Sequence, residues 1–227
     1  MPHQRTALLT ASLIALAAAV FVGTPEEIEK KSQEARARAT QAARLQQEDN
    51  IARAANPEAP GVLSKEGDMP LATLRRRMAQ LETLAAARQF TTRADPAALQ
   101  AMAASVGCVA DGKAQPAGFV RDQARSKVLS GAILLATCPG EAYLFIEVTP
   151  IATGKGSGSV VFPDLYTRRV AGRPALKYYF KAGNGRQKDT LFVLDGNDQY
   201  TLDYWSQGDS EQKAMTGARR LDTLAMP

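Results

Sequence analysis

The hydrophobic pattern of the chain changes at Cys108 from the period of a helix to that of a strand. In residues 71–107, apolar residues recur every three or four positions, and after Cys108 short apolar runs are separated by turn residues. Residues 127–137 and 142–149 are apolar enough to be central strands, with Pro139-Gly140 as a turn between them. Three more strands are expected at residues 176–181, 190–194 and 200–205. The pattern predicts an α+β fold in which helices pack on a mostly antiparallel β meander.

Two helices are predicted before Cys108. Over residues 71–90 an apolar stripe runs along one helical face: Leu71, Leu74, Met78, Leu81 and Ala85. The stripe fits a helix that packs on its own domain, and it also fits self-association through Leu71, Leu74, Met78 and Leu81. Asp95-Pro96 predicts the N-cap and first position of a second, shorter helix that ends near Gly107.

Residues 6–23 form an uncharged, apolar run of 18 positions. Arg5 precedes it and three glutamates follow it closely, which favours export of everything after Gly23. One interpretation is a signal peptide cleaved after Ala19, and the other is an uncleaved anchor, because Val20 and its neighbours extend the apolar run past that site. We expect the anchor, in the inner membrane of a bacterium, with the rest of the chain in the periplasm.

Cys108 and Cys138 are the only cysteines, and 29 residues lie between them. An oxidising compartment allows them to join, and the chain-entropy model then gives about 3.5 kcal/mol of stabilisation. Two reduced cysteines that act as small buried hydrophobes are the alternative. Export favours the disulfide.

The exported part is expected to have three regions after the membrane segment of residues 1–24. Residues 25–55 have strong helix formers but few large aliphatics, which predicts a polar helical stalk. Residues 56–70 are rich in proline and glycine and are interpreted as a linker. Residues 71–227 then form the α+β domain.

The single histidine, His3, precedes the apolar run, so the exported part contains none. This argues against Ser-His-Asp and Cys-His catalysis and against histidine-ligated metals, and we expect no cofactor, no metal and no catalytic residue. A pair of carboxylates needs geometry rather than a motif, so a histidine-free glycan hydrolase stays an alternative. Its candidate carboxylates are Glu141, Glu147, Asp164 and Asp203.

Positive charge is concentrated in residues 165–188, which contain seven bases and no acid. In the strand at residues 176–181, alternation turns Lys177, Tyr179 and Lys181 to an open face while the apolar positions face the core. Cations around an aromatic ring can bind an anionic partner. The candidate partner-binding residues are Arg168, Arg169, Arg173, Lys177, Tyr179, Lys181, Arg186 and Lys188.

These features predict a non-enzymatic, membrane-tethered scaffold or accessory subunit of a bacterial envelope complex, such as a secretion or pilus machine. Its expected partner is an acidic envelope protein, and nucleic acid is not expected because no binding motif is present. The first alternative is a soluble periplasmic inhibitor or immunity-type protein, released by signal cleavage near Ala19. The glycan hydrolase is the second.

Overall fold

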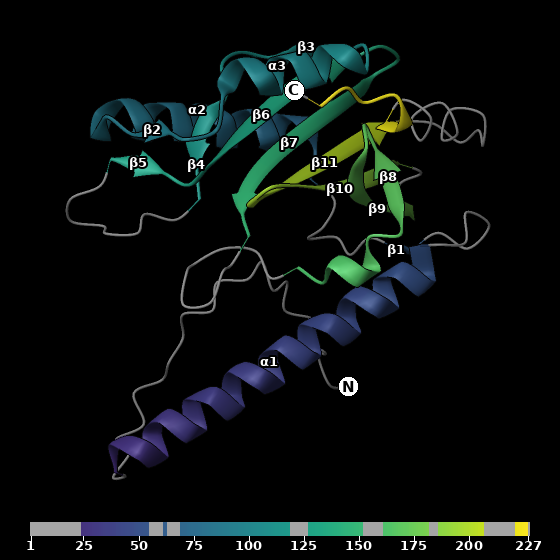
Figure 1. Ribbon diagram of the computed structural model, residues 1–227. Coiled ribbons are helices and arrows are strands. Elements are labelled where there is room, and N and C mark those ends of the chain that lie inside the picture. Colours follow the sequence, from purple (N-terminus) through teal and green to yellow (C-terminus); the bar gives the residue numbers. More distant parts are fainter. Residues whose placement is uncertain are drawn as a thin grey trace, which may run out of the picture. The chain divides into compact units, whose positions relative to one another are not determined.

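The computed structural model describes residues 24–54, 61–62, 69–118, 127–151, 161–181, 186–206 and 221–226 (Figure 1). The chain forms two compact units, residues 1–49 and residues 50–227, which are treated separately below. The predicted membrane segment of residues 6–23 lies outside the described residues, as does the predicted turn at residues 183–185. No helix among the described residues is long and apolar enough to span a membrane.

Helix α1 (Pro25–Ala54) contains 30 residues, as the helix-forming composition predicts. It begins with a capping box, because the Thr24 amide donates to a Glu27 carboxylate oxygen at 2.9 Å and the Glu27 amide donates back to the Thr24 hydroxyl at 3.4 Å. Its large aliphatic residues Ile28 and Leu45 are 48% and 58% exposed. The helix therefore has no buried apolar stripe over the part whose side chains are described.

The two predicted helices of the second unit are present. Helix α2 (Leu71–Arg88) ends at Gln89, which has a left-handed backbone. Helix α3 (Pro96–Ser105) starts as expected, since the Asp95 side chain accepts a hydrogen bond of 2.9 Å from the Ala97 amide. The two helices lie close to the sheet in Figure 1.

The described residues contain a sheet of nine strands, eight of which pair antiparallel. In chain order they are β1 (Gly61–Val62), β3 (Val109–Ala110), β4 (Gln115–Ala117), β6 (Gly131–Cys138), β7 (Ala142–Pro150), β8 (Arg168–Val170), β9 (Arg173–Lys181), β10 (Gln187–Asp195) and β11 (Asp198–Ser206). The central order is β1-β9-β10-β11-β7-β6-β3, and β1 alone pairs parallel, with β9. A separate pair joins β2 (Thr91–Thr92) to β5 (Val128–Leu129).

Both faces of the sheet are covered, and the register assigns each side chain to one of them. On the α3 face, α3 packs through Leu99 and Met102 on a core that includes Leu134, Ile146 and Leu202. On the opposite α2 face, the predicted stripe of α2 packs on a second cluster: Ile133, Leu135, Tyr143, Phe145 and Trp205. The stripe therefore packs on its own domain through Leu74, while Leu71, Met78 and Leu81 are half-buried, and self-association through the stripe stays a prediction.

Two details of the sheet differ from the sequence prediction. The strand expected at residues 127–137 is interrupted at Ser130, so that β5 pairs with β2 while β6 enters the main sheet. A meander, in which each strand pairs with the next along the chain, was expected. Instead the last strand, β11, pairs with β7, so that β9 and β10 lie on the far side of β11 from β7. The expected Asp195–Asp198 hairpin is present, with Gly196 in the left-handed region that suits glycine.

The disulfide is confirmed. Cys108 and Cys138 are bonded, with their Cα atoms 4.2 Å apart, and both residues are buried. Cys108 follows α3 and Cys138 ends β6, so the bond fixes the end of the helix to the sheet on the α3 face.

Candidate functional site

Three of the predicted partner-binding residues are exposed cations on β8 and β9. Arg168, Arg169 and Lys181 form no ion pair with any residue in the described ranges, and we call them the exposed cations. Arg169 donates one hydrogen bond of 2.8 Å to the Gly172 carbonyl, a neutral acceptor. Arg168 lies opposite Ala175 in the β8–β9 register. Arg169 lies opposite Pro174, and Lys181 is the last residue of β9, so the exposed cations lie near the two ends of this strand.

The face of β9 that was expected to be open is largely covered. Lys177 pairs with Asp222 at 3.0 Å and its side chain is only 10% exposed, while Tyr179 is half-buried. Arg173 pairs with Asp195 at 2.9 Å. The alternation itself holds, but the C-terminal residues that follow the sheet also pack on this face, which a local pattern cannot reveal.

Arg186 and Lys188 lie on the opposite, α2 face and contact aromatic rings. The Tyr143 and Trp205 rings stack with centroids 5.9 Å apart, and the Arg186 guanidinium lies 4.9 Å from the Trp205 centroid and 5.4 Å from that of Tyr143. The Lys188 ammonium lies 5.2 Å from the Trp205 centroid. Arg186 is buried and also donates to the Tyr143 hydroxyl. The structure thus divides the eight predicted residues between two faces of the sheet.

Lys188 belongs to a polar cluster on the α2 face. Its ammonium pairs with one Asp203 oxygen at 2.8 Å, and the Thr190 hydroxyl donates to the other at 2.5 Å. Glu147 lies on the neighbouring strand β7 and points to the same face, diagonal to Asp203. Burial raises the pKa of Glu147, Arg77 on α2 opposes this shift, and the Asp203 charge adds to it. One carboxylate is therefore held by a cation and the other is biased toward its protonated form.

The other two candidate carboxylates do not take part in this cluster. Glu141 is exposed in the turn between β6 and β7, with a left-handed backbone. Asp164 is exposed in the short helix η1 (Pro163–Leu165). Of the four carboxylates named from sequence, only Glu147 and Asp203 share one face of adjacent strands.

Sequence analysis missed Asp189, on the central strand β10. Asp189 is 1% exposed, and neither of its carboxylate oxygens accepts a hydrogen bond from the described residues. Burial raises its pKa to about 7, against the attraction of Lys177 and with a further increase from Asp222. A signal was available in the strand pattern, because Asp189 has the same parity as the core residues Leu191 and Val193.

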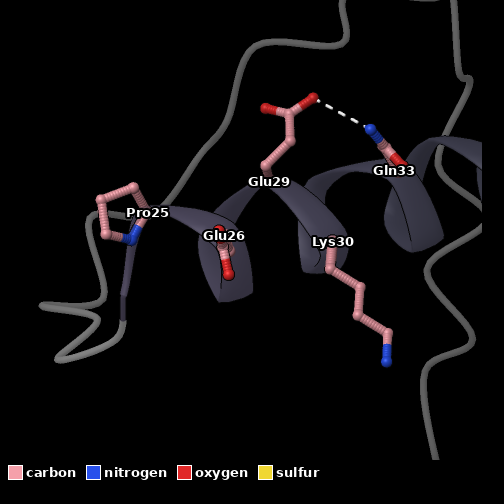
Figure 2. Close-up of a pocket in the computed structure, with 5 residues that line it drawn as sticks. All are labelled: Pro25, Glu26, Glu29, Lys30 and Gln33. Atoms are coloured by element: carbon pink, nitrogen blue, oxygen red, sulfur yellow. Dashed lines mark hydrogen bonds between the residues drawn. The ribbon is translucent and has the colours of Figure 1, made fainter.

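A shallow surface depression lies along the first two turns of α1 (Figure 2). Glu29, Lys30 and Gln33 line it, and the Gln33 amide donates to a Glu29 oxygen at 3.1 Å, which is an ordinary pairing one helical turn apart. Within the described ranges, no group of three or more Asp, Glu, His or Cys side chains is arranged to hold a metal ion.

Comparisons of the chain with protein-family models, with characterised proteins and with solved structures find no match.

Proposed function

We propose that this chain is a non-enzymatic, membrane-tethered periplasmic scaffold or accessory subunit of a bacterial envelope complex, and that it binds an acidic protein partner through the exposed cations. The 18-residue apolar run and the acidic residues after it support export with an anchor. The Cys108–Cys138 bond is consistent with an oxidising compartment.

The observation that carries the proposal is the contrast among the seven basic residues of the predicted set. Arg173, Lys177 and Lys188 are each paired with an aspartate, and Arg186 is buried against two aromatic rings. Cations that already have an internal partner contribute little to a further interaction, because the internal pair must first be broken. Arg168, Arg169 and Lys181 are exposed and form no ion pair with the described part of the chain, so they can attract an acidic surface and set its orientation.

The test is a charge reversal of the exposed cations in the full, oxidised chain. The variant carries Arg168→Glu, Arg169→Glu and Lys181→Glu, and its matched control carries Arg76→Glu, Arg88→Glu and Lys113→Glu, three exposed cations elsewhere in the same unit. Each protein is tagged and purified in mild detergent from the native host. We expect wild type and control to recover the same envelope subunits and the variant to recover about tenfold less. Equal recovery by the variant would exclude this surface.

Glycan hydrolysis by two carboxylates is a second candidate, and the arrangement of Glu147 and Asp203 favours it. General acid–base catalysis uses two carboxyl groups in different environments, and here burial raises the pKa of Glu147 while Asp203 pairs with Lys188 and accepts a hydrogen bond from Thr190. Release of fragments from purified cell wall should then be lost in Glu147→Gln and kept in Glu141→Gln. Absence of release by the wild-type protein would rule out this activity on cell wall.

A further inference from the structure

Residues 221–226, the C-terminal segment, pack on the α3 face of the sheet. Leu221 and Leu224 are 0% and 4% exposed and belong to the same cluster as Leu191 and Tyr204. The Ala225 amide donates to the Ser105 hydroxyl of α3 at 3.1 Å, so the segment, yellow in Figure 1, contacts both the sheet and the helix. Among the described residues, the contacts that attach the segment include Leu221, Leu224, the partly buried Met226, this hydrogen bond and one ion pair.

The ion pair joins Asp222 of the segment to Lys177 of β9. The ammonium nitrogen and the carboxylate oxygen are 3.0 Å apart, with side-chain exposures of 10% for the lysine and 50% for the aspartate. Because the lysine is nearly buried, its charge has to be neutralised locally. A change in which carboxylate neutralises Lys177 would therefore affect how firmly the segment is attached.

Asp189 is the second carboxylate near this lysine. It points to the same α3 face from the adjacent strand β10, diagonal to Lys177, and, beside the effect of burial, its pKa is lowered by the charge of Lys177 and raised by that of Asp222. Both of its oxygens are buried and accept no hydrogen bond from the described residues, and the same holds for Oε1 of Gln187 two positions away. An ionised carboxylate in such a position is strongly disfavoured unless it gains a cation.

The charged and titratable groups around Asp189 can be assigned from the register. Strand β9 contributes Lys177, Tyr179 and Lys181, strand β11 contributes Tyr204, and the C-terminal segment contributes Asp222. Helix α3 contains no titratable residue. With Asp189 protonated, Lys177 and Asp222 form a neutral pair, and with Asp189 ionised two carboxylates compete for one buried ammonium.

We propose that the C-terminal segment is a pH-sensitive clasp, docked while Asp189 is protonated and released when Asp189 ionises and takes Lys177 from Asp222. The proposal is independent of the partner proposed above. Burial raises the pKa of Asp189 to about 7, so the change lies close to neutrality. In the released state the carboxylate gains water and its pKa returns toward the ordinary 3.8, so release gives up a proton. The equilibrium for release therefore rises by up to about tenfold per pH unit between these two values.

Hydrogen–deuterium exchange of the full oxidised chain, read by mass spectrometry, tests the clasp. The peptide covering residues 221–226 is compared at about pH 5 and about pH 7, after correction for the intrinsic exchange rate, with peptides of β7 and β11 as the internal reference. We expect the protection of the segment to fall about tenfold or more at the higher pH while the reference strands stay protected. Equal protection of the segment at both pH values in the wild type would overturn the proposal.

Three variants assign the effect to the proposed groups. Asp189→Asn is expected to keep the segment docked at both pH values, with a change in protection below about twofold. Asp111→Asn, a matched change at an exposed aspartate that pairs with Arg75, is expected to keep the wild-type pH dependence. Asp222→Asn is expected to lower protection at both pH values. Persistence of the pH dependence in Asp189→Asn, or full protection in Asp222→Asn, would contradict the mechanism.

Discussion

At the scale of single residues, the polar groups inside the sheet decide how the protein responds to pH and to mutation. Asp189 and Asp203 are both buried carboxylates, on strands that are neighbours in the sheet. Asp203 has a lysine and a hydroxyl as partners, whereas Asp189 has no hydrogen-bond donor among the described residues. The two aspartates are therefore expected to respond in opposite ways when their charge is removed.

Replacing Asp189 with asparagine should stabilise the fold at neutral pH. The folded-state pKa is about 7 and the ordinary value is 3.8, so the folded protein binds a proton that the unfolded chain releases, and stability falls as pH rises from about 4 to about 7. We expect Asp189→Asn to flatten this dependence and to increase the free energy of unfolding at pH 7 by about 2 kcal/mol or more. Urea titrations at several pH values measure it, and parallel profiles for the two proteins would contradict the assignment.

Replacing Lys188 with methionine should have the opposite effect, because it leaves the Asp203 charge buried with only a hydroxyl partner. Removal of one member of a buried ion pair costs about 3 kcal/mol. The double variant Lys188→Met with Asp203→Asn has no unpaired charge and should recover part of the loss. A double-mutant cycle on the free energy of unfolding checks this, and strictly additive losses would show that the pair is not coupled.

At the scale of elements, the disulfide joins α3 to the sheet, and a glycine allows β6 to lie close to the backbone of β7. The Cys108–Cys138 bond closes a loop between positions 30 apart in the chain. Cys108→Ser with Cys138→Ser should lower the free energy of unfolding by about 3 kcal/mol. Reduction of the wild-type protein before denaturation should give a similar loss, and an unchanged stability in both cases would mean that packing alone holds α3 on the sheet.

Gly131 begins β6 where no larger residue fits. A Cβ atom at this position would collide with the Val148 carbonyl oxygen of β7. This oxygen belongs to the backbone of a paired strand, so it cannot move aside as a flexible side chain could. We expect Gly131→Ala to cost about 2 kcal/mol or more, from backbone displacement in a packed core. Gly140→Ala is the control, because a Cβ there meets nothing within 4 Å although the backbone is left-handed. Thermal unfolding compares the two, and an equal effect would exclude the steric explanation.

Much of the element structure could be predicted from local pattern. The Asp95 cap, the stripe of α2 and the strands β7, β9, β10 and β11 follow from periodicity and turn residues, because each signal lies within a few neighbouring positions. Strands β3, β4 and β8 have only two or three residues and carry no periodicity. The return of β11 to β7 depends on tertiary packing and leaves no local signal.

The candidate site was predictable in composition but not in arrangement. The run of bases in residues 165–188 is visible in the sequence, and so is the alternation that separates Lys177 and Tyr179 from the apolar positions of β9. The acids that pair with Arg173 and Lys177 are Asp195 of β10 and Asp222 of the C-terminal segment. Their positions follow from the folded topology, so sequence alone could not separate the paired cations from the exposed ones.

At the scale of the whole molecule, the account rests on how charge is distributed after folding. The full chain has a formal charge of +5, whereas residues 165–188 carry seven bases and no acid. Folding pairs or buries four of these bases and leaves Arg168, Arg169 and Lys181 on the surface of the second unit. A partner that recognises the bases of residues 165–188 by charge should therefore contact β8 and the end of β9.

The central claim is tested most directly by site-specific photo-crosslinking in the native host. A photoreactive residue replaces Thr167, exposed next to Arg168, or Ala87, exposed on α2 as the matched control. The account predicts that Thr167 crosslinks to an acidic envelope protein in the membrane fraction, that Ala87 does not, and that the intact mass is that of the full chain less two hydrogens. A crosslink from position 87 alone would contradict binding through the exposed cations. A soluble protein whose mass corresponds to a chain that starts at Val20 would contradict a membrane tether.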